Sequence, residues 1–149
     1  RGGKYSLFEA GTRVPFIVYW KDHITPGVSD ALISQLDIFS SLAALTGSNL
    51  RGPDSKELMD LLMGESNQGR EELIVEAMGR TAFRHNQWKY IPPHDGNSYM
   101  QNVKIETGAS DEPQLYDLTA DPSEEINLYD TRKEVADSLS GLFDAIRYQ

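Results

Sequence analysis

The chain of 149 residues is 39% hydrophobic and 25% charged, like an ordinary globular domain, and is long enough to bury a core. Its formal charge is −9, with 14 basic residues scattered among 23 acidic ones, whereas nucleic acid binding needs clustered Lys and Arg. No apolar run approaches the roughly 20 residues that cross a bilayer, and the lack of cysteine excludes disulfides and thiol chemistry. We therefore expect no nucleic acid partner and no membrane span.

The first half of the chain predicts a buried strand followed by a helix. The run at Val14–Trp20 is apolar throughout, which is typical of a strand buried on both faces in a parallel sheet. A short extended piece is expected near Ala31–Leu36, and a helix at about residues 38–46. Asp37 is placed as the N-cap of that helix, and Gly47 as the glycine that follows its C-terminus.

From Glu71 onward the pattern changes to short strands. Four strands are expected, the middle two as arms of a hairpin: Leu73–Ala77, Thr81–Arg84, Trp88–Ile91 and Gln114–Leu118. Residues 94–113 form a long polar connection, a length that favours a functional loop or an insertion.

The last segment predicts an amphipathic helix. Thr131 and Glu134 are spaced as a capping box. The helix after them brings four apolar side chains to one face: Val135, Leu139, Leu142 and Ile146. Residues 71–149 are therefore predicted to form a small antiparallel sheet packed by a C-terminal helix. Together with the buried strand near the start, this gives a fold class of α/β to α+β.

The opening segment contains the residues with the most specific chemistry. Lys4 follows Gly2 and Gly3, so the backbone there can approach a ligand closely. Glu9 and Arg13 are four residues apart, and an Arg can hold an oxyanion with two hydrogen bonds. The residues alone leave two interpretations open. One is an anion site formed by these charges, and the other is a solvated Lys4 beside a local Glu9–Arg13 ion pair.

Three motifs, in order, resemble those of the sulfatase family of the alkaline-phosphatase superfamily. The opening resembles the pattern G-x-K-x-x-x-[aromatic]-E-[small]-G-x-R-V-P, with matches at Gly2, Lys4, Phe8, Glu9, Ala10, Gly11, Arg13, Val14 and Pro15. The run from Leu36 to Gly47 is similar to the family segment D-[apolar]-x-x-[ST]-L-x-x-L-x-G. The run from Leu115 to Leu128 is similar to L-Y-[DN]-L-x-x-D-P-x-E-x-x-N-L, with Glu124 or Glu125 as its glutamate. The Trp88-Lys89-Tyr90 strand falls between them, as a similar strand does in the family.

The resemblance implies a role for each charged residue of the opening motif. The family lysine binds the sulfate oxygens, so Lys4 is expected to bind substrate and to be catalytic by stabilising charge on the transferring sulfuryl group. Glu9 and Arg13 are expected to support the loop without touching the reacting atoms.

The resemblance also implies machinery that the sequence does not contain. The family nucleophile is a formylglycine made from Cys or Ser in a [CS]-x-P-x-R motif. Its divalent metal, expected to be Ca²⁺, is bound by paired aspartates and an Asp-Asn or Asp-Gln step. This chain has no Cys, no Ser two residues before a proline, and neither an Asp-Asp pair nor an Asp-Asn step. We therefore expect the C-terminal portion of a sulfatase, without metal ligands and inactive alone.

In that larger enzyme, residues 1–70 would form the end of the catalytic α/β domain and residues 71–149 a small C-terminal subdomain. Residues from 1 to about 50 would belong to the end of a large mixed sheet. The enzyme would hydrolyse the sulfate ester of a sugar or an aryl alcohol in the periplasm or outside the cell, with any signal peptide upstream of Arg1. Expressed alone, the chain would expose strand edges at Val14–Trp20 and pair with a second copy.

The residues also allow two other functions, and they include histidines and an aspartate whose roles need to be assigned. The alternatives are a standalone non-catalytic module that binds an anion or a protein, and a fragment of a related phosphohydrolase. His23, His85 and His94 are too far apart for a local metal motif and are expected to be ordinary surface or loop residues. For His94 the alternative is that its long loop rims the substrate pocket. Asp37 is expected to be a helix cap and not a catalytic carboxylate.

Overall fold

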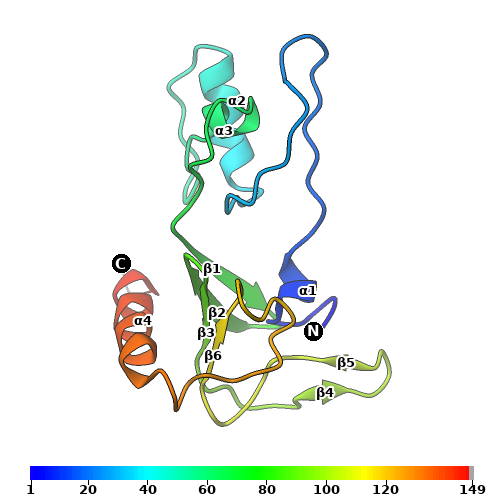
Figure 1. The fold of residues 1–149 in the computed structure, drawn as a ribbon, viewed down its shortest axis with the longest axis vertical. Helices are drawn as coiled ribbons and strands as arrows, with labels where there is room; N and C mark the ends of the chain where they lie inside the picture. The colour runs from blue at the N-terminus through cyan, green and yellow to red at the C-terminus, as the bar shows by residue number, and fades with distance from the viewer. Residues whose placement is uncertain (148–149) are drawn as a thin grey trace. The chain divides into compact units, whose positions relative to one another are not determined.

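The computed structural model describes residues 1–147 and divides the chain into two compact units (Figure 1). The sheet unit consists of Arg1–Pro15 and the segment from Glu72 onward, and the helical unit is Phe16–Glu71. Arg1–Pro15 groups with the sheet because its apolar side chains pack there. The sequence boundary between residues 70 and 71 concerns the domains of a larger enzyme and stays a prediction.

The sheet unit is built on four antiparallel strands in the order β1-β2-β3-β6. Their bounds are Glu72–Ala77 for β1, Arg80–His85 for β2, Trp88–Ile91 for β3 and Gln114–Asp117 for β6. The four predicted strands and the hairpin are confirmed. The predicted polar connection at 94–113 contains a hairpin of its own, formed by β4 (Tyr99–Met100) and β5 (Ile105–Glu106).

Helix α4 (Lys133–Arg147) packs against one face of this sheet (Figure 1). Phe83, Tyr90 and Leu115 form a buried cluster with Leu139 and Phe143 of the helix. The ring centroids of Phe83 and Phe143 lie 5.9 Å apart. The predicted small antiparallel sheet packed by a C-terminal helix is therefore confirmed.

The predicted capping box ahead of α4 is wrong. The first helical hydrogen bond runs from Ala136 N–H to the carbonyl of Arg132 at 3.0 Å, so the helix starts one residue later than a Thr131 cap requires. The hydroxyl of Thr131 donates instead to the carbonyl of Leu128 at 3.2 Å.

The opening segment covers the other face of the sheet. Leu7 and Phe8 are 0% and 2% exposed, and they form a second buried cluster with Ala82, Ile91 and Tyr116. Side chains of successive strand residues point to opposite faces, so the strands bury apolar residues on both. The sheet therefore lies between α4 and the segment that carries Lys4.

The helical unit contains α2 (Asp37–Leu45) and α3 (Met59–Leu62). Helix α2 ends at a left-handed Gly47 with φ of 74°, as predicted. The N–H of Ser48 donates to the carbonyl of Ala43, and the N–H of Gly47 to that of Ala44, each at 2.9 Å. This pair of hydrogen bonds is the Schellman motif, which satisfies the last carbonyls of the helix.

Asp37 is the first residue of α2 and not its cap, so the predicted cap is wrong. Its buried carboxylate accepts hydrogen bonds from the backbone N–H groups of Ser34 at 2.9 Å and Lys56 at 2.8 Å. Arg70 donates from Nε at 2.7 Å and from Nη2 at 2.5 Å. Burial acts to raise the pKa of Asp37, but these hydrogen bonds outweigh burial and lower it. The carboxylate therefore fastens three segments of the unit together.

Two extended segments predicted from the sequence are not strands in this chain. Val14–Trp20 and Ala31–Leu36 are irregular, and no described strand pairs with either of them. A strand needs a hydrogen-bonded neighbour, and the four-stranded sheet is made entirely from the other unit. Ile17 and Tyr19 are accordingly 88% and 82% exposed.

The helical unit should depend on the charge of Asp37. Asp37→Asn leaves the guanidinium of Arg70, 8% exposed, without its charge partner, and should cost about 3 kcal/mol or more. Because the folded pKa of Asp37 is lowered, its contribution should be complete above the unfolded pKa of about 3.9. It should then be lost as the pH falls through the folded value. Urea unfolding against pH measures both effects. Asp30→Asn, at an exposed site, should change stability by less than about 0.5 kcal/mol, and equal losses would contradict the assignment.

Candidate functional site

Lys4 lies at the tip of a tight turn in the segment Arg1–Arg13, which we call the Lys4 loop. The N–H of Ser6 donates to the carbonyl of Gly3 at 2.9 Å and closes the turn. Tyr5, the third residue of the turn, has φ of 78°, a left-handed conformation that type II turns require and that glycine usually supplies. For a residue with a side chain this costs roughly 1–2 kcal/mol. Such strain persists only where the surroundings hold it in place.

The residues that follow the turn fix its strained conformation. Ser6 through Glu9 are all buried, although Lys4 and Tyr5 beside them are exposed. The N–H of Leu7 donates to the carbonyl of Thr107 at 2.8 Å, and the N–H of Phe8 donates to the hydroxyl of Ser6 at 3.1 Å. The turn is thus an exposed tip on a buried base, joined to the segment after β5 and to the sheet.

Within the described residues, the ammonium of Lys4 has no carboxylate partner. Among residues 1–147 no acid lies within ion-pair distance of its Nζ, and the contact that it makes is with the ring of Tyr5, 4.9 Å from the centroid. An exposed, unpaired cation on a fixed turn is available to an anion. Preorganised positive charge of this kind stabilises negative charge that develops on a bound group.

Glu9 and Arg13 do not form the local ion pair that was one interpretation of their spacing. Glu9 is the first residue of α1 (Glu9–Thr12), and its carboxylate turns into the protein. Its Oε1 accepts from Lys89 Nζ at 2.9 Å, and its Oε2 accepts from Arg84 at 3.3 Å. Arg13 has an exposed side chain, and its backbone N–H donates to the carbonyl of Glu9 at 2.7 Å. The side chain of Glu9 therefore lies buried beneath the Lys4 turn, and the side chain of Arg13 lies exposed at the end of the loop.

His94 is held by a hydrogen bond to strand β2. Its Nε2 lies 2.7 Å from the carbonyl of Thr81, so this nitrogen must carry the proton and donate. Its backbone N–H donates to the carbonyl of Ser110 at 2.8 Å. The ring therefore has a structural partner, and a role of His94 at the rim of a substrate pocket stays a prediction.

Two residues beneath the turn, Lys89 and Glu124, belong to sequence motifs described above, but the sequence assigned neither of them a role. Lys89 in β3 and Glu124 after β6 have side chains that are 1% and 0% exposed, and Lys89 Nζ lies 3.4 Å from Glu124 Oε1. The sequence pattern of β3 indicates that Lys89 is buried, because strand alternation puts it on the same face as the buried Ile91. A lysine at a core position requires a buried carboxylate, but the sequence did not say which one.

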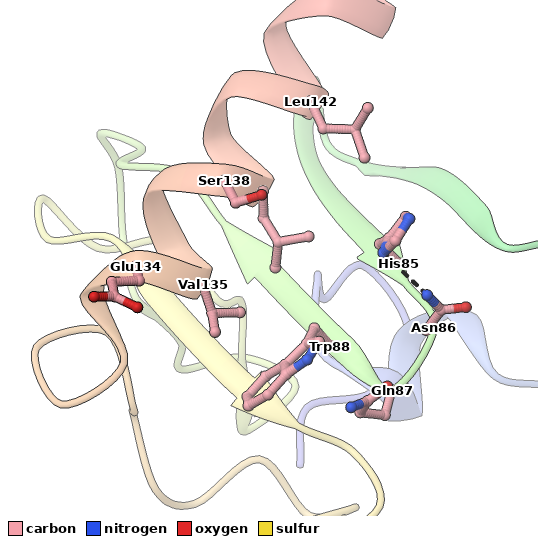
Figure 2. A pocket seen from close by; sticks show the side chains of 9 residues that line it. His85, Asn86, Gln87, Trp88, Glu134, Val135, Ser138 and Leu142 are labelled. Atoms are coloured by element: carbon pink, nitrogen blue, oxygen red, sulfur yellow. Dashed lines mark hydrogen bonds between the residues drawn. The ribbon is translucent and has the colours of Figure 1, made fainter.

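A cavity of about 450 Å³ lies on the other side of the sheet, between the β2–β3 turn and α4 (Figure 2). Trp88 and Val135 are among its apolar walls, and His85 and Asn86 stand at the turn, with Asn86 Nδ2 3.3 Å from His85 Nδ1. Because the Lys4 loop covers the opposite face, this cavity is not part of the Lys4 site.

Within residues 1–147 no three His, Asp or Glu side chains are grouped so that they could hold a metal ion. Over the same residues no helix combines the length and the apolar character that spanning a membrane requires.

Comparisons with known proteins point to one family. Residues 1–48 match the family model described as Sulfatase. The N-acetylgalactosamine-6-O-sulfatase of Bacteroides thetaiotaomicron is 44% identical over 151 aligned positions, which cover 99% of this chain and 30% of that protein. Arylsulfatase A of Homo sapiens is 33% identical over 143 positions, covering 86% of this chain and 28% of that protein.

Solved structures agree with the sequence matches. A structure described under the metabolism of multiple glycosaminoglycans by Bacteroides thetaiotaomicron superposes with a TM-score of 0.94 at 43% identity, covering 100% of this chain and 32% of that one. The PsFucS1 sulfatase from Pseudoalteromonas sp. superposes with a TM-score of 0.81 over 99% of this chain and 32% of that one, and at 22% identity this likeness shows the fold alone. The chain thus spans about 30% of the length of its relatives.

The Lys4 turn should not tolerate a side chain at Gly11. A Cβ there would lie 2.1 Å from the carbonyl oxygen of Ser6 and 2.8 Å from that of Gly3, so Gly11→Ala must displace the turn. We expect a loss of stability of roughly 2 kcal/mol or more and faster amide exchange at Ser6 and Leu7. The matched control is Gly141→Ala in α4, where a Cβ meets nothing within 4 Å, and where stability should rise by about 0.5–1 kcal/mol. Hydrogen exchange and urea unfolding measure both variants, and an unchanged turn in Gly11→Ala would refute the packing.

Proposed function

Because this chain belongs to the sulfatase family, we propose that it is the part of a sulfuric ester hydrolase that carries the sulfate-binding lysine, Lys4. The observation that supports this role is the geometry of the turn, an exposed and unpaired ammonium on a buried base. The resemblance of the opening motif to that of the family, whose lysine binds the sulfate oxygens, supports the same role for Lys4. Membership supports sulfate ester hydrolysis as the activity of the larger enzyme.

In this proposal Lys4 acts by charge. Its ammonium binds the sulfate oxygens and stabilises the negative charge that moves toward the leaving oxygen as the S–O ester bond breaks. The turn holds Lys4 in place before the substrate arrives, which lowers the ordering cost of binding. Glu9 supports the loop from beneath through its ion pairs, and Arg13 supports it from the edge. Neither touches the reacting atoms.

The residues of this chain do not fit the nucleophile and the metal site that the family implies. The sequence has no [CS]-x-P-x-R motif, and residues 1–147 contain no group of His, Asp or Glu suited to a metal. We therefore propose that a formylglycine and a Ca²⁺ are supplied by protein outside these 149 residues. On this view the chain alone does not hydrolyse sulfate esters.

A sulfated sugar is the preferred substrate class. The relative at 44% identity is named for the 6-O-sulfate of N-acetylgalactosamine, whereas aryl sulfates remain the class suggested by arylsulfatase A at 33%. The loop that follows His94 would contribute to the rim of the pocket. An enzyme acting on such esters would work in the periplasm or outside the cell.

The apolar segment Val14–Trp20 is proposed to be a surface covered by protein from outside the chain. Phe16, Val18 and Trp20 are 45%, 40% and 41% exposed, and so large an apolar run is seldom left to solvent. In the isolated chain a second copy would cover it.

Lys4→Ala tests the proposed role directly. In the enzyme that contains this chain, kcat should fall by about 10²–10³, the effect typical of removing one stabiliser of developing charge. In the 149-residue chain, weak binding of inorganic sulfate, followed by the NMR shifts of the backbone amides of residues 3–6, should disappear. Lys21→Ala, an exposed lysine in the helical unit, is the matched control and should change neither value. An unaltered kcat in Lys4→Ala would refute the proposal, as would turnover of an aryl sulfate by the chain alone.

The exposed segment predicts that the isolated chain self-associates. Light scattering should give a mass above that of the 16.7 kDa monomer, rising with concentration. Replacing Ile17 and Tyr19, the most exposed apolar residues of the segment, with Lys and Glu should return it to the monomer. A monomer with a single cooperative melt in the unmodified chain would contradict the prediction.

A further inference from the structure

Four charged side chains beneath the Lys4 loop form one cluster inside the sheet unit. Lys89 lies at its centre, with Nζ 2.9 Å from Glu9 Oε1 and 3.4 Å from Glu124 Oε1. Arg84 closes the cluster at 3.3 Å from Glu9 Oε2. Two acids face two cations, so the charges balance. The side chains of Lys89 and Glu124 are 1% and 0% exposed.

Burial makes the members of this cluster depend on one another. Desolvation raises the pKa of Glu124, and the charge of Lys89 and the N–H of Glu9 act against that rise. A buried charge left without its partner is strongly destabilising, whereas removing both charges of a pair together is often tolerated. The cluster can therefore be taken apart experimentally without leaving an orphan charge.

Glu124 also binds both ends of the loop that carries Lys4. Its side-chain Oε2 accepts the backbone N–H of Glu9 at 2.6 Å, after the turn. Its backbone carbonyl accepts the guanidinium of Arg1 at 3.0 Å, before the turn. Arg1 is fixed in addition by Glu106, with Nε 2.7 Å from Oε2. One residue of the segment after β6 thus fastens the loop on either side of Lys4.

We infer that Glu124, paired with Lys89, is a positioning residue for Lys4, and that its hydrogen bond to Glu9 N–H fixes the turn at which sulfate binds. The inference rests on the proposed function of Lys4 for its consequence. The positioning of the loop by the Glu124 side chain does not depend on whether Lys4 binds sulfate.

Two double variants separate positioning from stability. Lys89→Met/Glu124→Gln removes both charges but retains a side-chain oxygen that can accept the N–H of Glu9. Lys89→Met/Glu124→Leu removes the same charges and leaves no acceptor. Glu9 keeps Arg84 as its ion partner in both. The loss of charge is the same in both, so their urea midpoints should differ only by the effect of the one hydrogen bond to Glu9 N–H.

Hydrogen exchange of the 149-residue chain gives the first readout. In the Gln variant the amides of residues 5–11 should stay within about threefold of the unmodified rates, and in the Leu variant they should exchange about tenfold faster or more, as expected for one lost buried hydrogen bond. Amides of β2, β3 and α4 should respond alike in both. Equal protection of the loop in the two variants would overturn the inference, as would a loss of protection spread evenly over the whole sheet unit.

The sulfate titration gives the second readout. The NMR shift of Lys4 on adding inorganic sulfate should be retained in the Gln variant and reduced severalfold in the Leu variant. If the unmodified chain shows no response to sulfate while the exchange pattern holds, the proposed function of Lys4 fails and the positioning of the loop survives. If sulfate shifts Lys4 equally in both variants, the positioning fails and the proposed function survives.

Discussion

A carboxylate removed from water needs a cation and hydrogen-bond donors, and those that Glu124 has inside the sheet unit come from distant parts of the chain. Its partners are Lys89 from β3 and the backbone N–H of Glu9 from the opening segment. Satisfying one buried charge therefore joins three parts of the chain. The position of the Lys4 turn, and with it the availability of an unpaired ammonium, depends on this arrangement.

The sheet separates a face covered by α4 from a face covered by the Lys4 loop. On one face α4 buries Phe83 and Phe143 in an apolar cluster that needs no charge. On the other, apolar packing by Phe8 is combined with the ionic cluster around Lys89. Apolar contact alone is non-directional, whereas hydrogen bonds to a carboxylate fix distance and direction. The charged cluster around Lys89 therefore lies on the face that holds the Lys4 loop in one geometry.

The helical unit buries polar side chains at its centre and exposes apolar ones. Its buried centre is polar, with Asp37 and Arg70 joined by two hydrogen bonds, while Phe39 and Leu42 of α2 are about half exposed. Exposed apolar side chains such as these, and those of Val14–Trp20, are costly in water. Their exposure is consistent with a chain that spans about 30% of the length of its relatives.

The sequence by itself determined the features that depend on near neighbours. Strand alternation, the glycine after α2 and the amphipathic period of α4 are set within a few residues, and a short motif predicts the role of Lys4. Only the tertiary structure decided that Glu9 pairs with Lys89 and not with Arg13, and that Glu124 holds the loop. These hydrogen bonds join residues 80 and 115 positions apart. Local spacing contains no information about which distant charge will be brought close, because that choice is made when the two faces of the sheet are covered.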